Sequence, residues 1–436
     1  MLTAFARAFR TPDLRQKLLF TLAIMALFRF GSFVPTPGVD AGNVKTCLNL
    51  VTKSGETNQL YQLVNVFSGG ALLQLSVFAL GIMPYITASI IIQLLTVVIP
   101  RFEALKQEGQ QGTSKLTQYT RYLTVGLAIL QSTTLVAVAR SGQLFGAVNC
   151  PQIIPNRSIL TVVIMIITMT AGTGLIMWLG ELVTEKGVGN GMSLLIFTSV
   201  AAGFPSSLWA IEQAKGWWTM AVIIAIGLVI MGLVVFVEQS QRRIPVQYAK
   251  RMIGRRMYGG TSTYIPIKVN MAGVIPVIFA SSLLYLPALV AQFQGQSTAT
   301  WKVWIERYLT RGDHPLYILL YFGLIVFFTF FYVAITFNPD EVADNMKRYG
   351  GFIPGIRAGR PTAEYLDYVL TRVTFPGSIY LGLIALIPLI ALILVNASQN
   401  FPFGGTSILI VVGVGLETVK QIESQLQQRH YEGFLR

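Results

Sequence analysis

Residues 60–100 decide the fold, and they read LYQLVNVFSGGALLQLSVFALGIMPYITASIIIQLLTVVIP. The part from Val77 to Pro100 contains 24 residues and no charge. As a helix that rises about 1.5 Å per residue, it is long enough to cross a bilayer. The part before it is short, contains Asn65 and is broken at Gly69 and Gly70. Because broken backbone at membrane depth needs surrounding protein or water, we expect a half-helix at residues 60–73 that enters a cavity.

The composition indicates a membrane protein. Of 436 residues, 53% are hydrophobic and only 12% are charged, whereas soluble domains carry about 25% charged residues. The net charge of +14 does not by itself predict nucleic-acid binding, since Lys and Arg gather on the cytoplasmic side of membrane proteins. The fold class that we predict is therefore all-α and integral to the membrane.

Ten apolar stretches are predicted to be transmembrane helices. They cover residues 18–34, 77–100, 122–138, 158–179, 192–209, 217–237, 271–291, 316–337, 372–395 and 406–416. An even number places both ends of the chain on the same side of the membrane. The acid-free basic loop at 239–270 falls on that side too, as the positive-inside rule requires of the cytoplasm.

The stretches divide into a first half, 18–209, and a second half, 217–416. A basic, amphipathic cytoplasmic segment at 1–17 precedes them, and a cytoplasmic tail at 417–436 follows. The fifth and tenth stretches both look short and rich in glycine. Matching short segments in two halves indicate an inverted repeat around a central site.

The chain lacks the residues that most enzymes and cofactor sites need. Its two histidines and two cysteines form no metal-binding motif, and no phosphate-binding loop is present, so we expect no catalytic residue, metal or cofactor. Cys47 and Cys150 fall in loops predicted outside the membrane; unpaired thiols are favoured, with a disulfide left open. The spans contain few ionisable groups, which favours a passive pore driven by a partner over an ion-coupled transporter. A transporter, a membrane enzyme and a scaffold remain the alternatives.

Two pairs of apolar residues predict a constriction. Ile82 and Ile86 are four residues apart, as are Met192 and Ile196, so each pair shares one helix face. Lipid-facing or core packing is the alternative. A ring of such side chains would exclude ions and still yield to a passing chain.

Two cytoplasmic loops, 239–270 and 338–371, are candidate docking surfaces. The second presents Arg357 on a tip rich in glycine and proline. The first binds either lipid headgroups or an anionic partner such as RNA. Its basic residues are Arg242, Arg243, Lys250, Arg251, Arg255, Arg256 and Lys268. In addition, Gln93 and Asn270 are amides near the ends of apolar spans, where they can hydrogen-bond across helices.

Several motifs resemble those of the SecY family, the channel subunit of the bacterial Sec protein translocon, and the likeness covers nearly the whole chain. The motifs are PTPGVD (35–40), residues 65–100, QYTRY (118–122), GNGMSLLIF (189–197), RRIPVQYAKR (242–251), GRRMYGG (254–260), IPIKVNMAGVIPVIFASS (265–282), YGGFIPGIRAGRPT (349–362), GGTSILIVVGV (404–414) and YEGF (431–434).

The resemblance implies two five-helix halves around an hourglass pore that conducts signal-bearing polypeptides and releases transmembrane segments sideways into lipid. It implies a lateral gate whose polar cluster includes Gln93 and Asn270. The implied plug residues are Asn65, Phe67, Ser68, Gly69 and Gly70. The implied pore ring consists of Ile82, Ile86, Met192, Ile196, Ile278 and Ile410, and Met192 departs from the usual isoleucine.

The resemblance also implies a bacterial cytoplasmic membrane location and a set of partners. These are the SecE and SecG subunits, the SecA ATPase and the ribosome, with anionic lipid headgroups, and with SecDF and YidC as further candidates. The basic loop and Arg357 would dock the motor or the ribosome, which supplies the energy.

Overall fold

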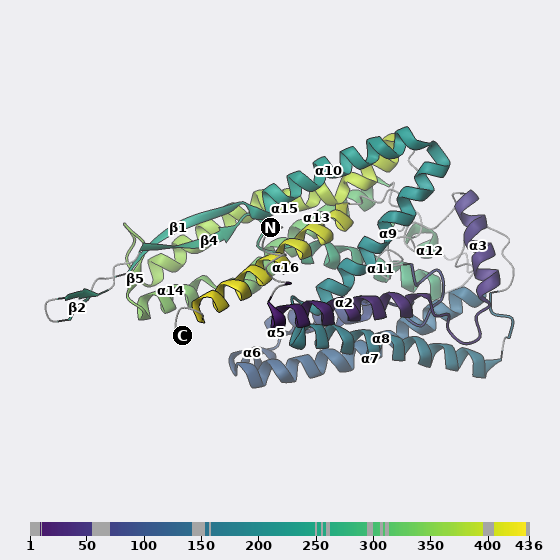
Figure 1. Cartoon of the computed structure of the whole chain (residues 1–436), viewed down its shortest axis with the longest axis horizontal. Helices are drawn as coiled ribbons and strands as arrows, with labels where there is room; N and C mark the ends of the chain where they lie inside the picture. The colour runs from purple at the N-terminus through teal and green to yellow at the C-terminus, as the bar shows by residue number, and fades with distance from the viewer. Residues whose placement is uncertain are drawn as a thin grey trace.

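The computed structural model describes residues 9, 11–54, 70–141, 153–156, 158–248, 251–253, 256–258, 262–293, 300–305, 308–309, 314–395 and 405–432. Its helices form an elongated bundle from which a β-hairpin projects at one end (Figure 1). The helix α3 lies at the opposite end, and α16 ends on the side of the hairpin.

The first half of the bundle runs from α2 to α9. Its helices are α2 (Pro12–Phe33), α3 (Ala41–Ser54), α5 (Met83–Val98), α6 (Pro100–Gln107), α7 (Gln110–Ser141), α8 (Ile159–Lys186) and α9 (Gly191–Lys215). Polar caps fix two of the starts: the Ser158 hydroxyl accepts from the Thr161 amide, and the Asn190 side chain accepts from the Met192 amide. The helix α3 falls in a region predicted as an external loop, and it buries Cys47 against α7 and α8. Cys150 lies outside the described residues, so its pairing with Cys47 stays open.

The second half runs from α10 to α16. Its helices are α10 (Trp217–Gln239), α11 (Ile275–Phe293), α12 (Thr300–Ile305), α13 (Pro315–Thr336), α14 (Pro339–Arg348), α15 (Arg360–Val395) and α16 (Gly405–Glu432). The two halves meet where α9 packs against α10 and α16, and where α11 approaches α5 and α7.

The basic stretch predicted as a loop at 239–270 contains a β-hairpin. Strand β1 (Gln241–Tyr248) pairs antiparallel with β4 (Ser262–Lys268), and β5 (Gly351–Phe352) pairs with β1. Two shorter strands, β2 (Arg251–Ile253) and β3 (Arg256–Tyr258), pair beyond it. Alternating apolar side chains, among them Ile244, Val246 and Ile267, are buried against α13 and α15. Apolar and polar residues alternate along these strands, and this alternation is the sequence pattern that could have predicted them.

The described helices follow the order of the ten predicted spans. Six of them are long and apolar enough to cross a membrane, and a pair bent by 104°, α5 with α6, adds a seventh. The six are α2, α7, α8, α10, α13 and α15. Shorter apolar segments lie in α9 (Gly191–Pro205) and α11 (Ile275–Leu284). Together with α16, these two helices correspond to the remaining predicted spans. That all ten cross the membrane stays a prediction.

One detail of the predicted spans is wrong. The second span does not become helical at Val77, because residues 70–82 form turns and α5 begins at Met83, where Pro84 occupies the first turn. The apolar part of α9, Gly191–Pro205, is short, in agreement with the prediction for the fifth span. The helices themselves continue beyond the predicted fifth and tenth spans: α9 has 25 residues and ends at Lys215, and α16 has 28 residues.

The start of the bundle and its end pack together on the hairpin side. Leu14 and Leu18 of α2 contact Ile422 of α16 and Val188 of the α8–α9 turn in one buried cluster. The described part of the N-terminal segment, residues 12–17, is continuous with α2. The described part of the tail, residues 417–432, continues α16, because the tail has an apolar face that it can bury.

Candidate functional site

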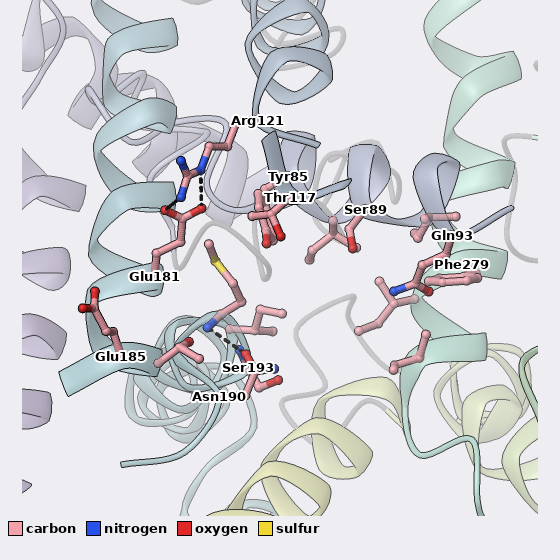
Figure 2. Close-up of a pocket in the computed structure, with 17 residues that line it drawn as sticks. Tyr85, Ser89, Gln93, Thr117, Arg121, Glu181, Glu185, Asn190, Ser193 and Phe279 are labelled. Carbon is pink, nitrogen blue, oxygen red and sulfur yellow. Dashed lines mark hydrogen bonds and ion pairs between the residues drawn. The ribbon is translucent and has the colours of Figure 1, made fainter. Parts of the chain in front are cut away.

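A cavity of about 530 Å³ lies between α5, α7, α8, α9 and α11. Its polar wall is formed by Tyr85, Ser89, Gln93, Thr117, Arg121, Glu181, Thr184, Glu185, Asn190 and Ser193. Its apolar wall is formed by Ile86, Ile90, Met192, Ile196, Ile275, Ile278 and Phe279. Figure 2 shows the charged groups on one side of this space and Gln93 with Phe279 on the other.

The structure brings the six predicted ring residues together, and four of them lie on the apolar wall of the cavity. Here these residues are called the constriction: Ile82, Ile86, Met192, Ile196, Ile278 and Ile410. Five of them belong to one apolar cluster, and the sixth, Ile278, lines the cavity beside three of the five. They come from α9, α11, α16 and the start of α5, so both halves of the bundle contribute. Their role as a seal stays a prediction.

Close helix packing places Met192 at the constriction. A Cβ atom on Gly191 would collide with the backbone oxygen of Gly180, so α8 and α9 cross with almost no side chain between them. The Gly191 amide donates to the Thr184 hydroxyl over 2.9 Å, and the Asn190 side chain caps α9. The glycines of the 187–191 run therefore form a turn between two helices, as predicted.

A bidentate ion pair stands at the polar wall of the cavity. In Figure 2, the Arg121 guanidinium of α7 faces the Glu181 carboxylate of α8. Nε lies 2.9 Å from Oε1, and the second contact, from a terminal nitrogen to Oε2, is 2.8 Å. Paired hydrogen bonds of this kind fix the relative orientation of two planar groups. The pair therefore joins α7 to α8 beside the cavity.

We expect Arg121→Ala to loosen α7 from α8 and to lower the free energy of unfolding by about 1 kcal/mol, because the pair is partly exposed. The measurement is the thermal unfolding of the purified chain in detergent. Lys115→Ala is the matched control, since Lys115 and Glu108 are both more than half exposed and 3.7 Å apart. The double variant Arg121→Glu with Glu181→Arg exchanges the two charges and should restore stability. If it is as unstable as Arg121→Ala, the ion pair does not join α7 to α8 in the way that we infer.

The two predicted gate amides lie in different surroundings. Gln93 of α5 is exposed on the cavity wall. Asn270, which is only 3% exposed, donates from Nδ2 to the Glu238 carboxylate over 2.5 Å and to the Gly273 carbonyl over 3.2 Å. The amide group of Asn270 thus bonds to the end of α10, and the assignment of Gln93 and Asn270 to one gate cluster stays a prediction.

Four of the five predicted plug residues, Asn65, Phe67, Ser68 and Gly69, lie outside the described residues. The fifth, Gly70, has a φ of +90°, which favours glycine. The segment that follows it is tied to the end of α2. The Val77 amide donates to the Val34 carbonyl over 2.9 Å, and the Thr36 hydroxyl donates to the Leu75 carbonyl over 2.7 Å. The chain between the predicted plug and α5 is therefore anchored.

The predicted docking residues lie at the hairpin end of the bundle. Arg242 and Arg243 lie on β1 and Lys268 on β4, all exposed, and the Arg243 guanidinium lies 4.9 Å from the centre of the Tyr264 ring. Strands β2 and β3 contain Arg251 and Arg256. Lys250 and Arg255 lie outside the described residues. The exposed Arg357 lies on the turn between β5 and α15.

Sequence reasoning missed the charged residues of the polar wall. Arg121, Glu181 and Glu185 fall just outside the predicted spans 122–138 and 158–179, whereas α7 and α8 extend to include them. The available signal was the helical spacing of Glu181 and Glu185, which places both on one face of α8. Glu238 was missed as well, because it directly follows an apolar run and looks like an ordinary helix end.

The model of the family described as SecY matches residues 76–419, which include the whole constriction. The chain belongs to the SecY family. Three relatives named protein translocase subunit SecY align with this chain over 100% of both sequences. The identity is 71% for the protein of Streptomyces galbus, 60% for that of Micrococcus luteus and 58% for that of Mycobacterium tuberculosis.

Solved structures with the same fold are more distant. One, described as a protein-conducting channel, is 18% identical, has a TM-score of 0.59 and covers 94% of this chain and 91% of its own. The idle yeast Ssh1 complex bound to the 80S ribosome is 14% identical, has a TM-score of 0.63 and covers 94% of this chain and 89% of its own. The predicted family and fold class are confirmed: this SecY-family chain is a multi-pass, pore-forming translocon subunit and not an enzyme.

Proposed function

We propose that this chain conducts signal-bearing polypeptides through the constriction, across the bacterial cytoplasmic membrane, with both termini in the cytoplasm. One observation carries the proposal: apolar side chains from both halves of the bundle converge beside a cavity with a polar, charged wall. A hydrophilic chain would enter from the polar wall and meet a narrow apolar ring. Such a ring excludes water and ions when nothing passes through it.

The constriction combines stiff and flexible side chains. Isoleucine is branched at Cβ and holds few rotamers, whereas methionine is unbranched and adapts to irregular neighbours. Met192 would therefore let the ring close around side chains of different sizes. In the resting channel, the plug at residues 60–73 would cover the ring from the other side.

The cavity also supports lateral exit. Its wall includes Gln93 of α5 and Phe279 of α11, which belong to different halves of the bundle. In our proposal, a hydrophobic signal or transmembrane segment separates α5 from α11 and passes between them into the lipid. The halves, residues 18–209 and 217–416, would move apart as units.

The energy would come from a partner. The exposed arginines of the hairpin and Arg357 lie at the end of the bundle that we assign to the cytoplasm, where the SecA ATPase or ribosomal RNA would dock. SecE and SecG would complete the channel, and SecDF and YidC would join it for particular clients. The same cations would also attract anionic lipid headgroups.

Crosslinking tests the proposal. Cys47 and Cys150 are replaced by alanine, one cysteine is placed at Ile196 or Ile410, and a secretory chain with its own cysteine is stalled in mid-passage. We expect a disulfide at both positions only when the stalled chain carries a signal. Leu228→Cys is the matched control, because this α10 side chain is 60% exposed on the outside of the bundle.

A disulfide at Leu228 of equal yield, or none at Ile196 and Ile410 in a complex shown to be engaged, would overturn the path through the constriction.

A further inference from the structure

Asn270, at the start of the α11 region, has a charged partner on a different helix. Its Nδ2 atom donates to Oε1 of Glu238, at the end of α10, over 2.5 Å. Hydrogen bonds to an ionised acceptor are roughly twice as strong as neutral ones. Because Asn270 is almost fully buried, water cannot readily replace this acceptor if it is lost.

The connection from β4 to α11 is held at several points around this bond. The Val269 amide donates to the Ser240 carbonyl over 3.1 Å, which ties the connection to the residue after α10. On the other side, a Cβ on Gly377 of α15 would collide with the Val269 carbonyl, so the two backbones touch. Gly273 has a φ of +61°, and α11 starts two residues later. The bond from Asn270 to Glu238 is thus one of several contacts that hold the last bend before α11, and it is the one that reaches a side chain of α10.

Glu238 is also placed to respond to its surroundings. Its partly buried carboxylate interacts electrostatically with Lys268 of β4 and Lys420 of α16, and with Tyr380 of α15. The hydrogen bond to Asn270 joins the end of α10 to the start of the α11 region, and the charges of Lys268 and Lys420 surround it. The wall of the cavity follows directly, since Ile275, Ile278 and Phe279 belong to the first turns of α11.

We propose that Glu238 is a positioning residue for the gate: through its bond to Asn270 it holds α11 in the closed position and sets how strong a signal segment must be to open the seam. The inference rests on the proposed function, in which α5 and α11 separate. A segment that displaces α11 must strain or break this bond.

The test measures how much export depends on the strength of the signal. Full-length variants are assembled with their partner subunits, and the export of a precursor with a weakened signal is compared with that of the intact precursor. We expect Glu238→Ala to raise export of the weakened precursor by about tenfold, the factor that corresponds to one charge-assisted hydrogen bond. Glu238→Gln keeps an acceptor oxygen but loses the charge, so it should raise export of the weakened precursor by only about threefold.

A donor–acceptor exchange distinguishes positioning from general stability. Asn270→Asp sets two carboxylates against each other and should open the gate at least as much as Glu238→Ala. Adding Glu238→Gln to Asn270→Asp reverses the direction of the bond and should restore dependence on a strong signal. Glu108→Ala is the matched control, because this glutamate is exposed, lies outside both candidate docking loops and pairs with the exposed Lys115. Membrane levels of all variants are measured by immunoblot.

The outcomes separate the two levels of the proposal. Suppose that Asn270→Asp lowers the requirement for a strong signal, that Glu238→Ala does not, and that adding Glu238→Gln to Asn270→Asp does not restore the requirement. The role of Glu238 is then overturned, whereas the proposed opening between α5 and α11 is retained. If Asn270→Asp has no effect either, while the stalled chain also fails to crosslink at Ile196, the proposed function itself fails. The double variant Asn270→Asp with Glu238→Gln is informative even if Glu238→Ala does not accumulate in the membrane. If the double variant exports the weakened precursor as readily as Asn270→Asp alone, the positioning role is overturned.

Discussion

Replacing Ile86 and Ile196 together by asparagine raises the ion conductance of the closed channel by roughly tenfold or more. Both side chains lie at the apolar wall of the cavity and belong to one apolar cluster, Ile86 on α5 and Ile196, which is 7% exposed, on α9. An amide at each position gives water hydrogen-bonding partners inside the ring. A hydrophobic constriction blocks ions because water does not stay in it, so a wetted ring conducts.

The measurement is the conductance of the purified channel in planar bilayers, without a translocating chain. Two variants serve as controls. Ile196→Val keeps the ring apolar and should leave the conductance unchanged. Ser193→Asn changes a cavity-lining residue three positions earlier on α9, outside the constriction, and should also leave it unchanged. Equal leakage from Ser193→Asn, or none from the double variant, would show that the seal lies elsewhere.

The constriction was partly predictable from the sequence because helical geometry determines which neighbours share a face. The spacing of four residues put Ile82 with Ile86 and Met192 with Ile196, but only the resemblance pointed to Ile278 and Ile410. No local pattern shows that a residue of α11 and one of α16 meet the other four, because this depends on packing between distant segments. The close crossing at Gly180 and Gly191 is of the same kind.

The errors have physical causes as well. The fifth span was predicted to end at residue 209, yet α9 continues through Pro205 to Lys215. Hydropathy marks where an apolar face ends and not where backbone hydrogen bonding ends, so the predicted spans leave out the polar extensions of α7, α8 and α16. The tail was hardest to foresee, because Ile422 is buried in a cluster with Leu14 and Leu18 of α2, which lies at the other end of the sequence.

The basic stretch at 239–270 shows a third kind of error. Its charges drew attention to docking, and the alternation of Ile244 and Val246 with polar residues was passed over. The strands matter for function, because a paired hairpin holds Arg242 and Arg243 in fixed positions. A flexible loop with the same charges would lose more entropy on binding a partner.

The second large effect is expected at Arg357. Arg357→Glu should reduce motor-driven export by about 30-fold or more, the loss of roughly 2 kcal/mol that defines an interface hot spot. The side chain is exposed, while its backbone is fixed: the Thr362 hydroxyl donates to the Arg357 carbonyl over 2.9 Å, and Ile353 is buried under the tip. Gly355 and Gly359, with φ values of +84° and +110°, complete the turn.

A rigid tip presents one charge at low entropic cost, so reversing that charge should prevent docking without disturbing the fold. Arg360→Glu makes the same change three residues later, at a side chain that is 88% exposed and pairs with Glu364. Because an exposed pair of this kind contributes little, export by this control should stay within about twofold of the parent chain. Export is measured with inverted vesicles, the motor and ATP, at matched channel levels. If both reversals reduce export equally, the tip contributes general positive charge; if Arg357→Glu exports normally, the partner docks elsewhere.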